Sequence, residues 1–169
     1  MMNRRDFLAH AGRLGAGMAG ALALAACSGA GEETNLNVTV QNLDGEPFTL
    51  ETLKGRPALV TFWATSCPGC IKEMPYLVGL HEQFADRGVT VLGIAMSYDN
   101  PEHVRNMVKR KGLPYRIAYD ESGGAALAFG KVRLTPSTFV LDGRGQVRYR
   151  HIGEFDVARV ESLLDRLAG

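Results

Sequence analysis

Two of the three cysteines, Cys67 and Cys70, stand two residues apart in the run Cys67-Pro68-Gly69-Cys70. An apolar run precedes the pair and a helical pattern follows it, so Cys67 is predicted at the N-terminus of a helix with Pro68 at its first position. Free backbone N–H groups there stabilise a thiolate, and such thiols have pKa values of about 3.5–7.5 instead of about 8.5. Cys67 is therefore predicted to attack disulfides, and the more buried Cys70 to resolve the mixed disulfide.

Other uses of a cysteine pair fit the flanking residues less well. A tetrahedral zinc site needs two more ligands at paired spacing, whereas His81, His103 and His151 are scattered over different predicted elements and are expected at the surface. Haem attachment needs a histidine after the second cysteine, where Ile71 stands. A peroxidatic Cys67 would follow Thr or Ser by three residues, but Ala64 is there. A redox-active disulfide is therefore the favoured role of the pair. A copper or zinc carrier, a peroxidase and a structural disulfide are the alternatives.

The first 26 residues have the pattern of an export signal. Arg4 and Arg5 lie in a run that resembles the twin-arginine signature of Tat signals, although paired arginines also occur in Sec signals. Residues 14–26 are uncharged, rich in Gly, Ala and Leu, and too few for the roughly 20 apolar residues of a membrane-spanning helix. The signal ends in Leu24-Ala25-Ala26-Cys27, which resembles a lipobox. We therefore predict a lipoprotein with lipid on Cys27, facing the periplasm or the cell exterior.

A lipidated Cys27 leaves only the other two cysteines to form a disulfide, which the compartment outside the cytoplasm permits. Residues 27–35 are predicted to be a tether and residues 36–169 a single domain. The 19 Lys and Arg residues balance 18 Asp and Glu residues without a basic stripe, so nucleic acid is not an expected partner. No nicotinamide or flavin motif is present, so the expected redox group is the disulfide itself and a membrane thiol donor must restore it.

Strand and helix patterns alternate after the tether. Turn signals at Asp44-Gly45 and at residues 142–145 each predict a β-hairpin. Nearly continuous apolar runs predict strands that are buried on both faces. These strands are expected at residues 58–64, 89–96 and 137–141, and helices at residues 71–87, 101–111, 124–129 and 156–167. The order predicts an α/β fold with a mixed central sheet flanked by helices.

The run Phe62 to Cys70, followed by Lys72-Glu73-Met74-Pro75, resembles the TlpA/ResA-like branch of the thioredoxin superfamily. The resemblance covers about residues 36–168, including the N-terminal hairpin and an extra βα segment at about residues 98–116. It implies a thioredoxin-like fold and a membrane-tethered thiol–disulfide oxidoreductase. It also implies a protein substrate with a disulfide, such as apocytochrome c, and we expect a monomer. Ser66 replaces a second Trp of the commonest motif, so a disulfide-forming oxidant remains an alternative.

The same resemblance implies roles for residues around the pair. Glu73 is expected partly buried beneath it, where it would move the proton of the second thiol, and burial would raise its pKa. Thr135-Pro136 is expected to be a cis peptide bond against the cysteines, with the Thr135 backbone open to a substrate peptide. Pro75 is expected to lie within the active-site helix and to kink it. The predicted substrate-binding residues are Trp63, Pro68, Gly69, Thr135 and Pro136.

Overall fold

The computed structural model describes residues 32–169, so Cys27, the export signal and part of the tether lie outside the described residues. Eight strands form one sheet in the order β1-β8-β7-β4-β5-β6-β2-β3. The strands are β1 (Glu32–Glu33), β2 (Thr39–Gln41), β3 (Pro47–Thr49), β4 (Ala58–Trp63), β5 (Thr90–Ala95), β6 (Arg116–Tyr119), β7 (Ser137–Leu141) and β8 (Gln146–Ile152). The central strands β4, β5 and β6 are parallel, and β7 joins β4 antiparallel, which confirms the predicted mixed sheet.

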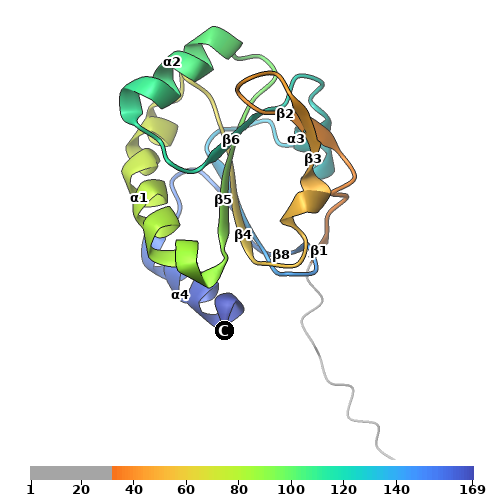
Figure 1. Ribbon diagram of the computed structural model, residues 1–169, viewed down its shortest axis with the longest axis vertical. Coiled ribbons are helices and arrows are strands. Elements are labelled where there is room, and N and C mark those ends of the chain that lie inside the picture. Colours follow the sequence, from red (N-terminus) through yellow and green to blue (C-terminus); the bar gives the residue numbers. More distant parts are fainter. Residues whose placement is uncertain (1–31) are drawn as a thin grey trace, which may run out of the picture. The chain divides into compact units, whose positions relative to one another are not determined.

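Four α-helices flank the sheet, and two short 3-10 turns, Leu50–Leu53 and Ala85–Arg87, complete the elements. The helices are α1 (Pro68–Phe84), α2 (Pro101–Lys111), α3 (Gly124–Ala128) and α4 (Val157–Ala168). Figure 1 shows α1, α2 and α4 on one side of the central strands and α3 on the other, next to the β2–β3 hairpin that ends the sheet. The expected insertion is confirmed, because α2 lies between the parallel strands β5 and β6.

The strand β4 is buried along its whole length because both faces of the sheet are covered. Leu59 and Trp63 point into the core beneath α1, α2 and α4. Val60 and Phe62 point into the second core, which contains the apolar side chains of α3 and the first 3-10 turn. Alternate residues of a strand face opposite sides, so covering both sides requires a continuous apolar run. This explains the sequence pattern and fixes β4 rigidly at the centre of the sheet.

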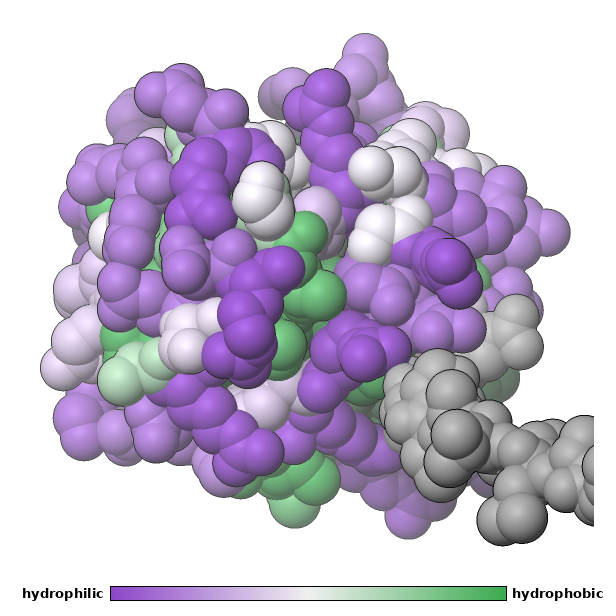
Figure 2. Space-filling model, turned by 90° about the horizontal axis from the view of Figure 1, so that it is seen from below, coloured by the Kyte–Doolittle hydropathy of each residue, from purple (hydrophilic) through white to green (hydrophobic). Residues whose placement is uncertain are grey.

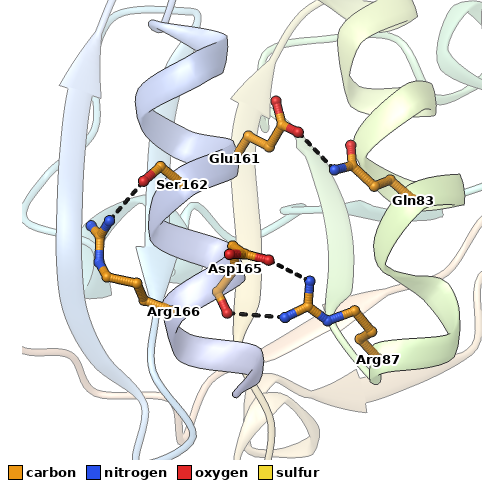
Figure 3. Close-up of polar contacts among 6 residues, drawn as sticks. All are labelled: Gln83, Arg87, Glu161, Ser162, Asp165 and Arg166. Atoms are coloured by element: carbon orange, nitrogen blue, oxygen red, sulfur yellow. Dashed lines mark hydrogen bonds and ion pairs between the residues drawn. The ribbon is translucent and has the colours of Figure 1, made fainter.

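The helix α4 lies beside α1 and the 3-10 turn that follows α1, and polar contacts join their exposed edges (Figure 3). Arg87 Nη1 lies 2.6 Å from Asp165 Oδ1, and Gln83 donates to Glu161 Oε1 at 2.7 Å. Exposed ion pairs contribute about 0–1 kcal/mol to stability. Burial of apolar side chains contributes more, and Leu164 of α4 is fully buried under these contacts. The closing helix is therefore held mainly by its predicted apolar face.

The N-terminal boundary of the domain differs from the prediction. Residues Glu32 and Glu33, expected in the tether, form the edge strand β1 and pair antiparallel with Val147 and Gln146 of β8. Thr34 is also buried. The sequence signal was absent because two acidic residues carry no strand pattern, and their pairing depends only on a partner strand 113 residues or more away in the chain.

The face of the domain seen in Figure 2 is largely polar. Figure 2 views the end at which α4 terminates, where hydrophilic residues cover most of the surface and hydrophobic residues form small areas between them. Within residues 32–169, no helix is long and apolar enough to cross a lipid bilayer.

Candidate active site

The cysteine pair sits at the junction between β4 and α1. Cys67 is the N-cap residue of α1, with extended backbone angles (φ −96°, ψ 106°), and Pro68 follows at the start of the helix. The backbone N–H of Cys70 donates to Cys67 Sγ at 3.1 Å. One of the unpaired N–H groups of the first helical turn therefore points at the sulfur, as predicted from the sequence, and such a donor stabilises a thiolate there.

Cys67 and Cys70 form a disulfide, with Cα atoms 5.3 Å apart. Cys67 is 8% exposed and Cys70 only 3%, so an incoming sulfur can reach Cys67 more readily. This confirms the predicted order of accessibility. Within residues 32–169, no three His, Cys, Asp or Glu side chains gather into a group that could hold a metal ion.

Pro75 lies inside α1, and the helix continues beyond it to Phe84. The prediction of a helix that passes through this proline is confirmed. Both Cys70 and Glu73 are on the buried side of α1, at positions three residues apart. Side chains at this spacing are neighbours on a helix, with Cβ atoms about 5–6 Å apart.

A polar clamp fixes the loop before Cys67. The carboxylate of Asp99 accepts from the backbone N–H of Thr65 at 2.6 Å and from its hydroxyl at 2.7 Å. The hydroxyl of Tyr119 in turn donates to the backbone oxygens of Ser97 and Asp99. Sequence reasoning identified the helix start at Asn100 but missed Asp99, because its partner lies 34 residues away in the chain.

The peptide bond between Thr135 and Pro136 is cis, as expected. The ring of Pro136 lies against Gly69, between the two cysteines in the chain, because a Cβ atom added to Gly69 would come within 3.3 Å of Pro136 Cδ. The carbonyl of Pro136 accepts from the backbone N–H of Gly153 at 2.8 Å. A side chain at Gly69 would therefore crowd the proline ring, and Thr135, which precedes the proline, is partly exposed.

Glu73 is buried, with 3% of its surface exposed. Its Oε1 atom accepts from the backbone N–H of Phe155 at 2.6 Å, whereas Oε2 has no hydrogen-bond partner among the described residues. Burial raises the pKa of Glu73 to about 7; the Phe155 N–H opposes this rise, and the charge of Glu154 contributes to it. A carboxyl with such a pKa can accept and release a proton near neutral pH.

The loop between β8 and α4 supplies the partners of Glu73. Glu154 forms an exposed ion pair with Lys72 at 2.6 Å. The hydrogen bond and the charge of Glu154 raise the pKa of Lys72. Sequence reasoning missed Glu154 and Phe155, since nothing local shows that a loop more than 80 residues away covers the active-site helix.

Trp63 does not lie where substrate contact was expected. Its side chain is 3% exposed and belongs to the core cluster that also contains both cysteines. Its Nε1 atom faces Gly93, where an added Cβ would come within 3.2 Å. We therefore assign the indole to packing behind the cysteine pair, because its burial leaves no surface for a peptide to touch.

A redox disulfide at the start of the helix after a central strand, facing a cis proline in this sheet, defines a class of protein: a thiol–disulfide oxidoreductase of thioredoxin-like fold. A model of the redoxin family matches residues 30–164, and the chain belongs to that family.

Individual relatives agree with this assignment. The chain is 31% identical over 137 residues to thiol-disulfide oxidoreductase ResA of Halalkalibacterium halodurans, covering 80% of this chain and 76% of the relative. It is 35% identical over 130 residues to thiol:disulfide interchange protein DsbE of Pasteurella multocida, covering 68% of each. A thiol:disulfide interchange protein of the thioredoxin family from Chlorobium tepidum superposes with a TM-score of 0.71 at 29% identity, over 82% of this chain and 97% of that structure.

Removal of the Glu73 charge should change how stability depends on pH. The pKa of Glu73 is about 7 in the folded protein and near its ordinary value of 4.5 in the unfolded chain. Between these values the folded state holds the proton that the unfolded state has lost, so the free energy of unfolding falls as pH rises. The difference of about 2.5 in pKa corresponds to about 3 kcal/mol. Urea unfolding of oxidised protein should show that Glu73→Gln lacks this loss between pH 4 and pH 8.

Glu82→Gln is the matched control, because Glu82 is exposed on the same helix. It should follow the pH dependence of the wild type. A Glu73→Gln curve parallel to the wild-type curve would show that Glu73 titrates at its ordinary pKa.

Proposed function

We propose that this thiol–disulfide oxidoreductase is an exported, lipid-anchored reductant that reduces disulfides of protein substrates outside the cytoplasmic membrane. The observation that carries the proposal is the buried Glu73 carboxyl, one helical turn from Cys70 and with a pKa of about 7. A reductant must activate its buried second thiol to release the substrate, and a neutral-pH base beside that thiol meets this need. Similarity to ResA and DsbE supports the same chemistry.

The first step forms a mixed disulfide. In the reduced protein, the Cys67 thiolate at the N-terminus of α1 attacks one sulfur of the substrate disulfide. A bond forms between Cys67 Sγ and that sulfur, and the substrate S–S bond breaks. The other substrate sulfur leaves as a thiolate and takes a proton from water.

The second step releases the substrate. The Glu73 carboxylate takes the proton of the Cys70 thiol, and Cys70 Sγ attacks Cys67 Sγ. The Cys67–substrate bond breaks, and the substrate sulfur leaves as a thiolate that takes a proton. Two electrons have passed to the substrate, and the site now holds the Cys67–Cys70 disulfide, the form that the structure describes. A thiol donor in the membrane restores the dithiol by the same exchange run on this disulfide.

The substrate peptide is proposed to lie extended along Thr135, with its cysteine between Pro136 and the exposed ring of Pro68. Hydrogen bonds between the backbones of the substrate and of Thr135, beside the cis proline, would give affinity that does not depend on a particular substrate side chain. Gly69 keeps this approach open because it carries no side chain. A protein with an exposed, flexible disulfide fits such a surface, and apocytochrome c is the substrate we propose.

Cysteine variants test this mechanism. The probe is a peptide with a Cys-x-x-Cys-His disulfide, the haem-attachment motif. Reduced Cys70→Ser should accumulate a covalent complex with the peptide, because the resolving thiol is missing, and dithiothreitol should release it. Reduced Cys67→Ser should react about 100-fold more slowly, because Cys70 is buried and lacks the position at the helix start. The complexes are counted by mass spectrometry.

Wild-type protein serves as the reference and should release the peptide as a dithiol while becoming oxidised. Equal trapping by Cys67→Ser and Cys70→Ser would contradict the assigned roles. A reduced wild-type protein that leaves the peptide oxidised would contradict the proposed direction of electron flow.

Membrane attachment through Cys27 has its own test. When the full chain is expressed in bacteria, the wild type should sediment with the membranes and take up labelled palmitate. Cys27→Ser should lose the label and move to the soluble fraction, while its oxidoreductase activity stays unchanged. Membrane association of Cys27→Ser equal to that of the wild type would contradict the lipid anchor.

A further inference from the structure

Positive charge is concentrated in one segment of the domain. Five of the 16 Lys and Arg residues within residues 32–169 lie in residues 103–119, a segment that contains no Asp or Glu. The other 11 are outnumbered by the 17 Asp and Glu residues of the domain. The segment covers most of α2 and continues through β6. Such an uneven distribution of charge favours partners of the opposite sign.

Two of these five cations have structural contacts. Arg116 Cζ lies 3.7 Å from the centroid of the Phe48 ring, and Arg105 donates to the Leu43 carbonyl oxygen at 3.5 Å. The other three are exposed in the last turn of α2 and have no acidic partner among residues 32–169. They are Lys109, Arg110 and Lys111. Cations stabilise the C-terminus of a helix, which explains their place in α2 but not the surface around them.

Two hollows border α2, and each is lined by one of these three cations. The first, called here the polar hollow, has a volume of about 240 Å³ and contains Thr65 from the loop before Cys67. Its residues from α2 are His103, Asn106, Met107 and Arg110. Positions three, four and seven residues after the first share one face of a helix. Of the three histidines expected at the surface, His103 is exposed, whereas His81 and His151 are partly buried.

The second hollow, called here the apolar hollow, lies between α1 and the end of α2 and has a volume of about 270 Å³. Its lining residues are Ile71, Met74, Pro75 and Val78 of α1, with Lys111 and Leu113 opposite. The wall is apolar except for the lysine. A segment with both an apolar and an acidic side chain therefore fits this hollow.

Both hollows adjoin the reactive pair. Thr65 stands two residues before Cys67, and Ile71 directly follows Cys70. Two residues span at most about 7 Å, so a substrate whose sulfur reaches Cys67 brings its neighbouring residues close to both hollows. Asp99 holds the loop through its hydrogen bonds to Thr65 and forms no ion pair with the cations of α2.

We propose that the two hollows bind an acidic segment of the protein substrate next to its disulfide. Substrate carboxylates lie on Arg110 and Lys111, and an apolar substrate side chain enters the apolar hollow. The inference deepens the proposed function, on which it rests, because it states which protein disulfides the site prefers. Charge complementarity identifies this occupant, since the segment presents unpaired cations and no acid.

An anionic membrane surface would also attract these cations. A membrane that covered both hollows would also cover the cysteine pair between them, and so would block exchange with protein substrates. The position of the hollows therefore favours the substrate as their occupant.

Peptides with matched flanks test the preference for acidic segments. Each peptide contains a Cys-x-x-Cys-His disulfide and a six-residue flank, rich in Glu or in Gln, either before or after the cysteines. Six extended residues span about 20 Å, which is enough to cross either hollow. At low salt, reduced wild-type protein should reduce an acidic peptide about fivefold faster than its Gln counterpart. The ratio should fall below about twofold at about 0.5 M NaCl, because salt screens exposed charges.

The double variant Arg110→Gln/Lys111→Gln should lower the ratio of the two rates to below about twofold at low salt, because the cations that contact the flank are lost. The matched control is Arg56→Gln/Arg144→Gln, which removes two exposed positive charges near the opposite end of β4. It should keep the wild-type ratio. Circular dichroism of the oxidised proteins checks that both variants fold.

The apolar hollow has its own comparison. An acidic peptide with one Leu in its flank should react about twofold faster than the same peptide with Ala there, and Val78→Asn should remove this gain. Leu127→Asn is the control, since it changes an exposed apolar residue of α3 that lines neither hollow. A gain that persists in Val78→Asn would contradict the assignment of this hollow.

The outcomes separate this inference from the proposed function. Equal rates for the Glu and Gln peptides in the wild type, or a preference kept by Arg110→Gln/Lys111→Gln, would overturn the inference and leave the proposed reductant intact. If this variant instead loses binding to phosphatidylglycerol vesicles while it keeps the peptide preference, the cations serve a membrane contact and the inference is wrong. A reduced wild type that leaves every peptide oxidised would overturn the proposed function and the inference with it.

Discussion

The burial of β4 on both faces is the constraint on which the active site depends. Because β4 is covered by one core under α1, α2 and α4 and by another under α3, its end is fixed in the molecule. Cys67 follows that end by four residues and caps α1. The strand therefore fixes the position of the sulfur, and the first turn of the helix supplies a backbone N–H donor to it. The Asp99 clamp on Thr65 removes the remaining freedom of the connecting loop.

The same arrangement buries a carboxyl group, that of Glu73, in the core. The α1 helix must pack its inner side against the sheet, and Glu73 stands on that side with the cysteine that needs a base. The protein loses stability near neutral pH by keeping it there, because a charged carboxylate is disfavoured in the core. A purely structural helix would carry an apolar residue at this position. We propose that this cost serves proton transfer to and from Cys70.

Much of the fold could be predicted from local patterns. Apolar runs located β4, β5 and β7, and cap residues such as Asn100 located helix starts, because these signals are written in neighbouring residues. The cis proline and the burial of Glu73 could be expected only from family resemblance. The remaining parts, β1, Asp99 and Phe155, depend on contacts between distant segments. No local pattern encodes such contacts.

The direction of electron flow is the central claim, and the equilibrium reduction potential of the Cys67–Cys70 pair tests it most directly. The Cys27→Ser chain, which has no third thiol, is equilibrated with glutathione or dithiothreitol buffers, and free thiols are trapped and counted. A potential at or below about −250 mV, near that of thioredoxin, is the value expected of a reductant that needs a membrane electron supply. A potential above about −180 mV, in the range of disulfide isomerases and oxidants, would contradict the account and make the protein a disulfide donor.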